Sequence, residues 1–181
     1  EQNFPDEAFR TYVKTTFDLD DDNVLSNDEI AAATKIDCRG KGVKDLTGIE
    51  FFTELTELDC RGNDLSAKPL DLSANTKLKK IDLYDAKLKA INVSKLLDLE
   101  HLNVGNNNLM ALDVSNNTKL TYLDFYYNME LTSPVNLSNL TELDYLSTYG
   151  TPLGTLDLSN NTKLTSLTCT KCNLTTLNVS M

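Results

Sequence analysis

The chain has 181 residues and carries 17 basic against 27 acidic side chains, a formal net charge of −10. No basic stripe is present to neutralise phosphates, so nucleic acid is not expected as a partner. No run of 18 apolar residues occurs, so membrane insertion is not expected either. No signal peptide is recognised, and the chain begins at Glu1 rather than Met, which suggests a processed or trimmed N-terminus.

The acidity is concentrated at the start of the chain, because residues 1–32 hold nine acidic and only two basic residues. A first helix is predicted before Asp18, with Pro5 in its first turn. A second helix is predicted from the run Ile30-Ala-Ala-Ala. We therefore treat residues 1–32 as a helical N-terminal cap. The apolar side of its first helix would consist of Phe9, Tyr12, Val13 and Phe17.

The segment DLDDDNVLSNDE between Asp18 and Glu29 matches a twelve-residue EF-hand loop. Carboxylates fall at loop positions 1, 3, 5 and 12, a spacing that wraps hard oxygen ligands around one point. The segment thus predicts an EF-hand-like turn with Ca²⁺ as a candidate cofactor. The candidate ligands are Asp18, Asp20, Asp22, the carbonyl of Val24, Ser26 and Glu29.

Two features of this loop leave calcium binding open. Asn23 stands where an EF-hand has Gly, although Asn tolerates the left-handed conformation better than other residues do. In addition, Ser26 and Glu29 form the sequence signature of a capping box, which starts a helix without any metal. A calcium loop and a metal-free turn are therefore both compatible with the sequence.

One phrase, Leu-x-x-Leu-x-Φ-x-x-Asn-x-Leu with Φ apolar, recurs down the rest of the chain. Its clearest copies begin at Leu55, Leu99 and Leu120, and weaker ones at Ala33, Leu78, Leu143 and Leu164. The starts are 21 to 23 residues apart, a period typical of leucine-rich repeats. The predicted fold is an α/β repeat solenoid over residues 33–181. It would be a right-handed coil of about seven turns with a parallel concave β-sheet.

Each phrase predicts a short strand, because its apolar residues alternate with a period of two. The leucines and Φ should face the interior, and the phrase's Asn should bond backbone groups at the turn that follows. Those Asn residues are Asn63, Asn107 and Asn128. Between the first two phrases, apolar residues spaced by three predict a short 3₁₀ segment, whereas the later connections look more extended.

The four cysteines fit the repeat. Cys38 and Cys60 are the Φ residues of two successive phrases, so we interpret them as buried thiols in preference to a disulfide. Cys169 and Cys172 form a C-x-x-C pair, which elsewhere indicates redox or metal chemistry. Here Cys169 is again Φ, and Cys172 takes the Asn position, where the repeat accepts either Asn or Cys. A structural role is therefore favoured.

The second half of each repeat carries a serine in register and, two residues before it, an alternation of Asp with Asn. The serine hydroxyls are expected to bond nearby backbone. The alternation keeps carboxylates from stacking on each other and predicts a ladder on the convex side. The serines are Ser73, Ser94, Ser115, Ser138, Ser159 and Ser180, and the ladder is Asp71, Asn92, Asp113, Asn136, Asp157 and Asn178.

Aromatic residues gather in the positions that should face outward on the concave sheet. Tyr122, Tyr126, Tyr145 and Tyr149 are expected to form a two-by-two block across neighbouring coils. Grouped exposed tyrosines are typical of interfaces, because each ring gives a large rigid area with a polar tip. The alternative is aromatic packing that only covers the sheet. The candidate ligand-binding residues are Tyr84, His101, Tyr122, Tyr126, Tyr127, Tyr145 and Tyr149.

The first coils carry a column of acids instead, formed by Asp37, Asp59 and Asp82. Paired acids occur in glycosidases, but Lys35, Lys80, Arg39 and Arg61 flank this column, so lateral ion pairs explain it more simply. No nucleophile and base are brought together by the pattern, and we expect no enzymatic activity.

The stretches GVKDLTGIEFFTELTELDCRGNDL and LDLSNNTKLTSL, with the acidic segment before them, resemble internalin-like bacterial cell-surface leucine-rich repeat proteins of gut bacteria. The resemblance implies a secreted or surface protein that binds macromolecules without catalysis. A protein ligand on the concave face is expected, with a glycan ligand or a spacer role as alternatives. The chain stops at Met181 within a repeat, so a C-terminal cap is expected to be lacking.

Overall fold

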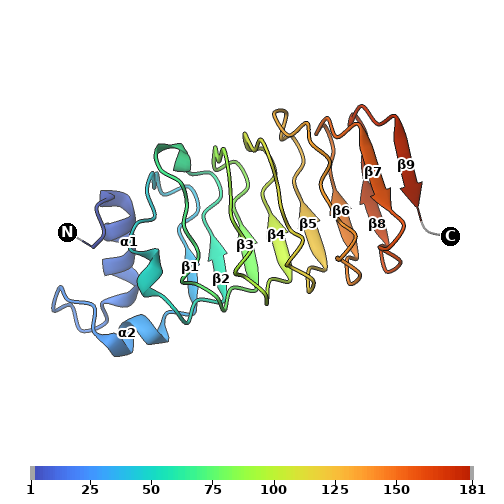
Figure 1. The fold of residues 1–181 in the computed structure, drawn as a ribbon. Coiled ribbons are helices and arrows are strands. Elements are labelled where there is room, and N and C mark those ends of the chain that lie inside the picture. The colour runs from blue at the N-terminus through green and yellow to red at the C-terminus, as the bar shows by residue number, and fades with distance from the viewer. Residues whose placement is uncertain (1–2, 180–181) are drawn as a thin grey trace.

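The computed structural model describes residues 3–179 as two short helices followed by a solenoid (Figure 1). Helix α1 (Glu7–Phe17) and helix α2 (Asn27–Ala32) lie at one end, and the last strands lie at the other. Seven strands pair in parallel, in chain order. They are β1 (Lys35–Asp37), β2 (Glu57–Asp59), β3 (Lys80–Asp82), β4 (His101–Asn103), β5 (Tyr122–Asp124), β6 (Tyr145–Ser147) and β8 (Ser166–Thr168).

The backs of the coils are mostly irregular. The short 3₁₀ segment predicted after the first phrase is present at Ile49–Phe51, and a second one spans Leu65–Ala67. At the far end the backs become extended, and β7 (Thr155–Leu158) pairs in parallel with β9 (Thr176–Val179). The predicted leucine-rich repeat solenoid of about seven coils is therefore confirmed. No helix within residues 3–179 has the length and apolar character needed to cross a membrane.

The strand register follows the repeat phrase one position at a time. Leu58, Leu102 and Leu123 stand at the centre of their strands, and each is at most 1% exposed. Neighbouring coils align these leucines, since Leu102 pairs in register with Leu123. Every coil thus adds the same inward row to one continuous apolar core, and the residues on either side of each leucine face outward.

The phrase's Asn closes the turn after β2, β4 and β5, as predicted for Asn63, Asn107 and Asn128. The Asn107 amide donates to the carbonyls of Leu83 and Val104 at 2.9 Å each, and its oxygen accepts the backbone N–H groups of Ala86 and Leu88. These bonds join two successive coils. Because the side chain is buried, it satisfies backbone groups that water cannot reach.

The cysteines also occupy their predicted positions. Cys38 and Cys60 are free and fully buried, with their sulfur atoms 2.8 Å apart. Burial and the neighbouring thiol raise the pKa of Cys60, which keeps it protonated. Cys172 stands in the place of the turn Asn, where its thiol donates to the Thr148 carbonyl at 2.9 Å. Cys172 thus makes a turn contact comparable to that of the Asn it replaces.

Three further buried Asn side chains each link one coil to the coil before it, and these links fall at every second junction. Asn75, Asn117 and Asn161 each donate to two carbonyls of the preceding coil, in which the equivalent position is apolar: Phe52, Leu96 or Leu140. On the outside of the same three junctions, a lysine pairs with an acid of the preceding coil. These ion pairs are Lys77–Glu54, Lys119–Asp98 and Lys163–Glu142.

One detail of the predicted convex ladder is wrong. The serine hydroxyls were expected to bond the backbone. Instead, the Asp or Asn two residues earlier accepts the backbone N–H of the serine, as from Ser73 to Asp71 at 2.9 Å and from Ser94 to Asn92 at 3.0 Å. An Asp or Asn side chain two residues before the serine reaches the serine N–H and so closes an Asx turn. Ser180 lies outside the described residues.

The helices cover the first coil. Asp6 caps α1 by accepting the Phe9 N–H, and its second oxygen accepts the N–H of Lys44. Pro5 therefore precedes the cap and does not lie in the first turn, contrary to the prediction, because Asp6 is the better N-cap. The Tyr12 hydroxyl accepts the Asp37 N–H, which satisfies a backbone group on the open edge of β1.

Candidate functional site

The predicted tyrosine block lies on the concave sheet but divides into three groups. His101, Tyr122 and Tyr145 stand in register on β4, β5 and β6. Their rings stack face to face, with centroids 4.0 Å and 4.4 Å apart and interplanar angles of 13° and 2°. Burial and the charge on Lys80 lower the pKa of His101, so the imidazole is neutral at pH 7.

The second group pairs Tyr126 with Tyr84, two coils away, and not with Tyr149 in the adjacent coil. Their ring centroids are 5.8 Å apart and the rings tilt by 23°. Gly105 is the reason, because it occupies the same column in the coil between them. A Cβ atom there would lie 2.6 Å from the Tyr126 ring. The missing side chain lets Tyr126 lean back toward Tyr84, so the expected two-by-two block does not form.

The third group lies at the exit of the strands. Tyr127 and Tyr149 meet edge to face, with centroids 5.1 Å apart, and the Lys171 ammonium lies 5.3 Å from the Tyr149 ring. Hydrogen bonding to Lys171 and Tyr127 lowers the pKa of Tyr149. Gly150, with φ +73°, allows this contact, because a Cβ there would lie 2.7 Å from the Tyr127 ring.

The middle concave column changes character along the solenoid. In the first coils, as predicted, acids pair with arginines: Arg61 binds Asp59 at 2.7 Å and reaches Asp82 at 3.6 Å. Arg39 bridges Asp37 and Asp59 in the same way, at 2.7 Å and 3.6 Å. From the β3 coil onward the arginines are replaced by Tyr84, Gly105 and Tyr126, while the neighbouring column has Asp82, the neutral Asn103 and then Asp124.

Asp124 is the member of this column that sequence reasoning missed as a candidate. It is only 6% exposed, and it has no ion-pair partner among residues 3–179. Its oxygen accepts the Tyr126 N–H at 3.1 Å. Burial raises the pKa of Asp124, although hydrogen bonds from Tyr126, Ser147 and Tyr122 oppose that rise. The signal in the sequence was an acid that recurs after the neighbouring column of arginines has ended.

The predicted calcium loop brings three carboxylates together. Oxygens of Asp18, Asp20 and Asp22 all lie within 4.8 Å of one another. Asp18 Oδ2 accepts the N–H of Asn23, whereas Asp18 Oδ1 is buried without a hydrogen-bond partner. Asn23 adopts φ +68°, the left-handed conformation expected where an EF-hand has Gly.

Glu29 serves the alternative role in the same loop. Its Oε2 accepts the Ser26 N–H at 2.9 Å, which completes the capping box of α2, and its Oε1 accepts the Leu19 N–H at 2.6 Å. These bonds lower the pKa of Glu29. The carboxylate therefore closes the loop by itself, and the three clustered aspartates remain as the groups that fit a hard cation.

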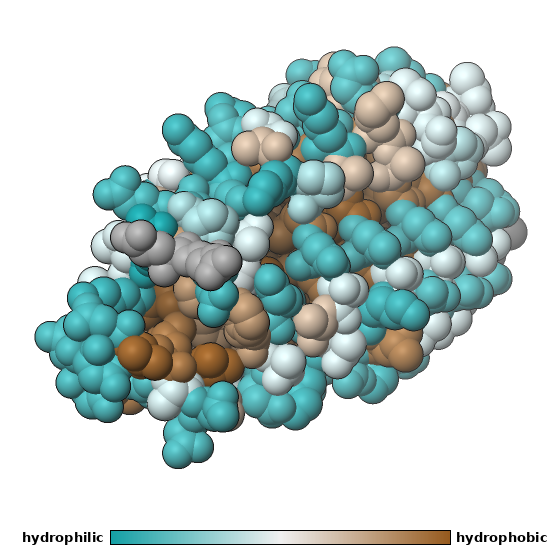
Figure 2. Space-filling model, turned by 60° about the vertical axis from the view of Figure 1, so that its left-hand side comes forward, coloured by the Kyte–Doolittle hydropathy of each residue, from teal (hydrophilic) through white to brown (hydrophobic). Residues whose placement is uncertain are grey.

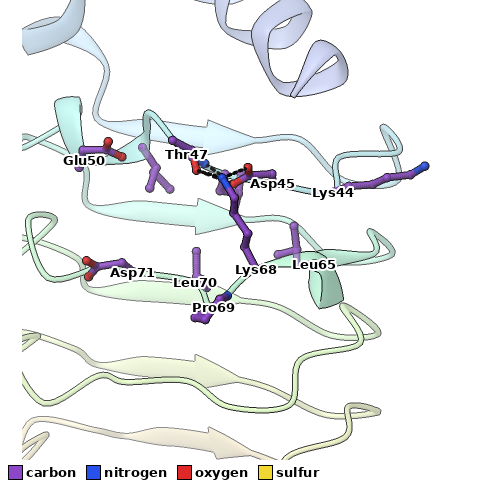
Figure 3. A pocket seen from close by; sticks show the side chains of 11 residues that line it. Lys44, Asp45, Thr47, Glu50, Leu65, Lys68, Pro69, Leu70 and Asp71 are labelled. Atoms are coloured by element: carbon purple, nitrogen blue, oxygen red, sulfur yellow. Dashed lines mark hydrogen bonds and ion pairs between the residues drawn. The ribbon is translucent and has the colours of Figure 1, made fainter. Parts of the chain in front are cut away.

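A hollow of about 240 Å³ lies on the backs of the first two coils (Figure 3). Its central polar groups point toward one another: Lys68 pairs with Asp45 at 2.8 Å, and Asp45 also accepts the N–H and hydroxyl of Thr47. Although burial acts to raise the pKa of Asp45, these bonds from Lys68 and Thr47 lower it overall. Because Lys68, Asp45 and Thr47 already bond to one another, they leave few free hydrogen-bonding groups for a polar ligand in the hollow.

Comparison with known proteins finds similarity to internalins, while no known family profile matches the chain. Internalin J of Listeria monocytogenes serotype 4b strain F2365 is 38% identical over 73 residues, which is 40% of this chain and 8% of that protein. The solved functional domain of InlJ from Listeria monocytogenes has a TM-score of 0.73 and 30% identity, and the match covers 99% of this chain and 43% of that one. The chain is internalin-like in both sequence and fold.

Further similarity concerns the fold alone. Internalin C2 from Listeria monocytogenes strain 4b F2365 superposes with a TM-score of 0.60 at 18% identity, over 99% of this chain and 95% of that one. The InlJ domain is described as including a cysteine ladder. In this internalin-like chain, Cys38 and Cys60 stack in the same position of successive coils. The chain spans about 8% of the length of the curated internalin J sequences that it matches.

Proposed function

We propose that this internalin-like chain is a non-enzymatic recognition module of a secreted or surface protein, and that it binds a protein ligand on its concave face. The observation that supports this best is an aromatic surface of two stacked groups. His101, Tyr122 and Tyr145 stack across neighbouring coils, and Tyr84 stacks on Tyr126 two coils away. Partly buried, rigid aromatic side chains lose little conformational entropy on binding and are typical of interface hot spots.

The stacking favours a protein over a glycan. The faces of the Tyr122 ring are covered by His101 on one side and Tyr145 on the other, at 4.0 Å and 4.4 Å. A sugar ring stacks on an open aromatic face, and the inner faces of this row are occupied. What remains accessible is chiefly ring edges and hydroxyls, which suit the mixed apolar and polar surface of a protein segment.

The test uses a displayed library of random peptides and a glycan array, both probed with the wild-type chain and with Tyr126→Ala/Tyr145→Ala. Loss of two hot-spot rings should weaken selected peptides at least about tenfold. The matched control is Leu97→Ala/Met110→Ala, which removes two exposed apolar side chains outside the concave columns. Unchanged binding by the tyrosine variant would refute the concave site, and selective glycan binding would favour the second ligand class.

We further propose that Ca²⁺ binds the N-terminal loop as a structural ion. The buried and unpartnered Asp18 Oδ1, beside two further carboxylates, supports this assignment. Asp18, Asp20 and Asp22 would hold the ion, which would offset the repulsion among them. The ion would thereby stabilise the cap and would take no part in ligand chemistry.

A further inference from the structure

The concave arginine ladder ends before the acidic column does. Arg39 and Arg61 each bind the aspartate of their own coil and reach toward that of the next. At β3 the arginine position becomes Tyr84, yet an acid returns in the neighbouring column at Asp124, after the neutral Asn103. A carboxylate that is 6% exposed therefore lacks, among residues 3–179, the cation that its equivalents in the first coils have.

The surroundings of Asp124 suit a planar cation. The row of His101, Tyr122 and Tyr145 stands on one side of the column, and Tyr84 and Tyr126 stand on the other. The tyrosine hydroxyls at the accessible edges can accept hydrogen bonds from a guanidinium, which also stacks on an aromatic face where one is open. The chain's formal net charge of −10 adds a long-range attraction for a basic partner.

We infer that the concave site recognises an arginine side chain of a protein ligand, which lies between the two aromatic rows and pairs with Asp124. The mode of binding has a precedent within the molecule, where the forked guanidinium of Arg61 reaches aspartates of two coils. Arginine suits this better than lysine, because its planar fork binds carboxylates in a bidentate way. The inference rests on the proposed function and specifies its ligand chemistry.

The experiment titrates the ¹⁵N-labelled protein with hexa-arginine, hexa-lysine and hexa-citrulline peptides. Citrulline keeps the shape of arginine without its charge. We expect hexa-arginine to bind most tightly and to shift the amide signals of Asn103, Gly105 and Tyr126. Asp124→Asn should weaken that binding at least about tenfold, since it removes a desolvated charge partner.

Asp157→Asn is the matched control, because it makes the same change of charge at an exposed position on the convex side. It should leave the affinity for hexa-arginine within about twofold, as expected for an exposed charge outside the site. Equal weakening by both variants would overturn the inference, because the attraction would then be non-specific. Equal binding of the citrulline or lysine peptide would also overturn it, as would shifts confined to residues 18–29.

A second measurement distinguishes failure of the arginine inference from failure of the concave binding site. Peptides selected from the random library are tested against Tyr126→Ala/Tyr145→Ala and against Asp124→Asn. If they lose affinity for the tyrosine variant but contain no arginine and tolerate Asp124→Asn, the concave site stands and the arginine inference fails. If they tolerate the tyrosine variant as well, the proposed function fails.

Discussion

At the scale of single residues, the burial of the Asp124 carboxylate lowers the stability of the folded protein at neutral pH. Burial raises its pKa above that of an unfolded chain, so the charged carboxylate is less stable in the folded protein than in water. Asp82, two coils away, adds repulsion, while Ser147 and Tyr122 donate hydrogen bonds that offset part of the cost. A group of this kind contributes more to binding a cation than to stabilising the fold.

Asp124→Asn should therefore raise the melting temperature at neutral pH. A carboxyl whose folded pKa is raised favours the native state only once it is protonated, so wild-type stability recovers as pH falls through that pKa. The advantage of the variant should shrink over the same range and vanish below the unfolded value. Thermal denaturation from pH 7 downward measures this difference.

Asp157→Asn is expected to behave in the opposite way. The pKa of Asp157 is lowered, because its carboxylate accepts the Ser159 N–H and hydroxyl. Its stabilising effect is present above the unfolded pKa and is lost as pH falls, so the substitution should lower the melting temperature at pH 7. A gain of stability from both substitutions would contradict the assigned role of Asp124.

The outward positions of the tyrosines could be predicted from the repeat, but their pairing could not. Alternation along a strand determines which face a side chain takes. The choice of Tyr84 as the partner of Tyr126 depends on the empty space above Gly105, a packing effect between coils. The end of the arginine column could be read from the sequence, but the burial of Asp124 depends on packing between coils and could not.

At the scale of elements, the sequence predicted the strands closely because each one repeats the same core requirement. All seven predicted phrases place a strand in the main sheet. The N-terminal helices were also predicted, but the role of Pro5 was wrong, because a proline before an N-cap and one inside the first turn leave similar patterns. The loop between the helices was ambiguous, since one glutamate can serve a metal or a capping box.

Calcium should decide between those roles. Millimolar Ca²⁺ is expected to raise the melting temperature, and EDTA should reverse the gain, because the ion would satisfy the buried Asp18 oxygen. Asp20→Asn/Asp22→Asn should abolish the response. Asp71→Asn, which lies on the convex ladder, is the control and should preserve it. A melting temperature unaffected by calcium would remove the metal and leave the capping box as the whole explanation.

At the scale of the whole molecule, stability should depend on where along the solenoid a contact is lost. Leu102 and Leu167 hold the same repeat position, but Leu102 is fully buried in a central coil and Leu167 is only half-buried near the end. Leu102→Ala should cost about 2–5 kcal/mol in urea unfolding. Leu167→Ala should cost clearly less, with hydrogen exchange rising only in the last coils. Equal costs would show that the solenoid unfolds as a uniform block.

The two-by-two joining of coils has a mechanical consequence. Three junctions carry both a buried amide bridge and an outer lysine–acid pair, as at Asn117 with Lys119. Within residues 3–179, the junctions between them lack the buried amide bridge, and only the one between the coils of β3 and β4 has a comparable lysine–acid pair, Lys79–Glu100. Under a pulling force, the solenoid should yield first at those seams. Each event would release a two-coil segment of about 43 residues, or roughly 140–160 Å of extended chain. If the chain holds a ligand as proposed, such steps would absorb tension gradually.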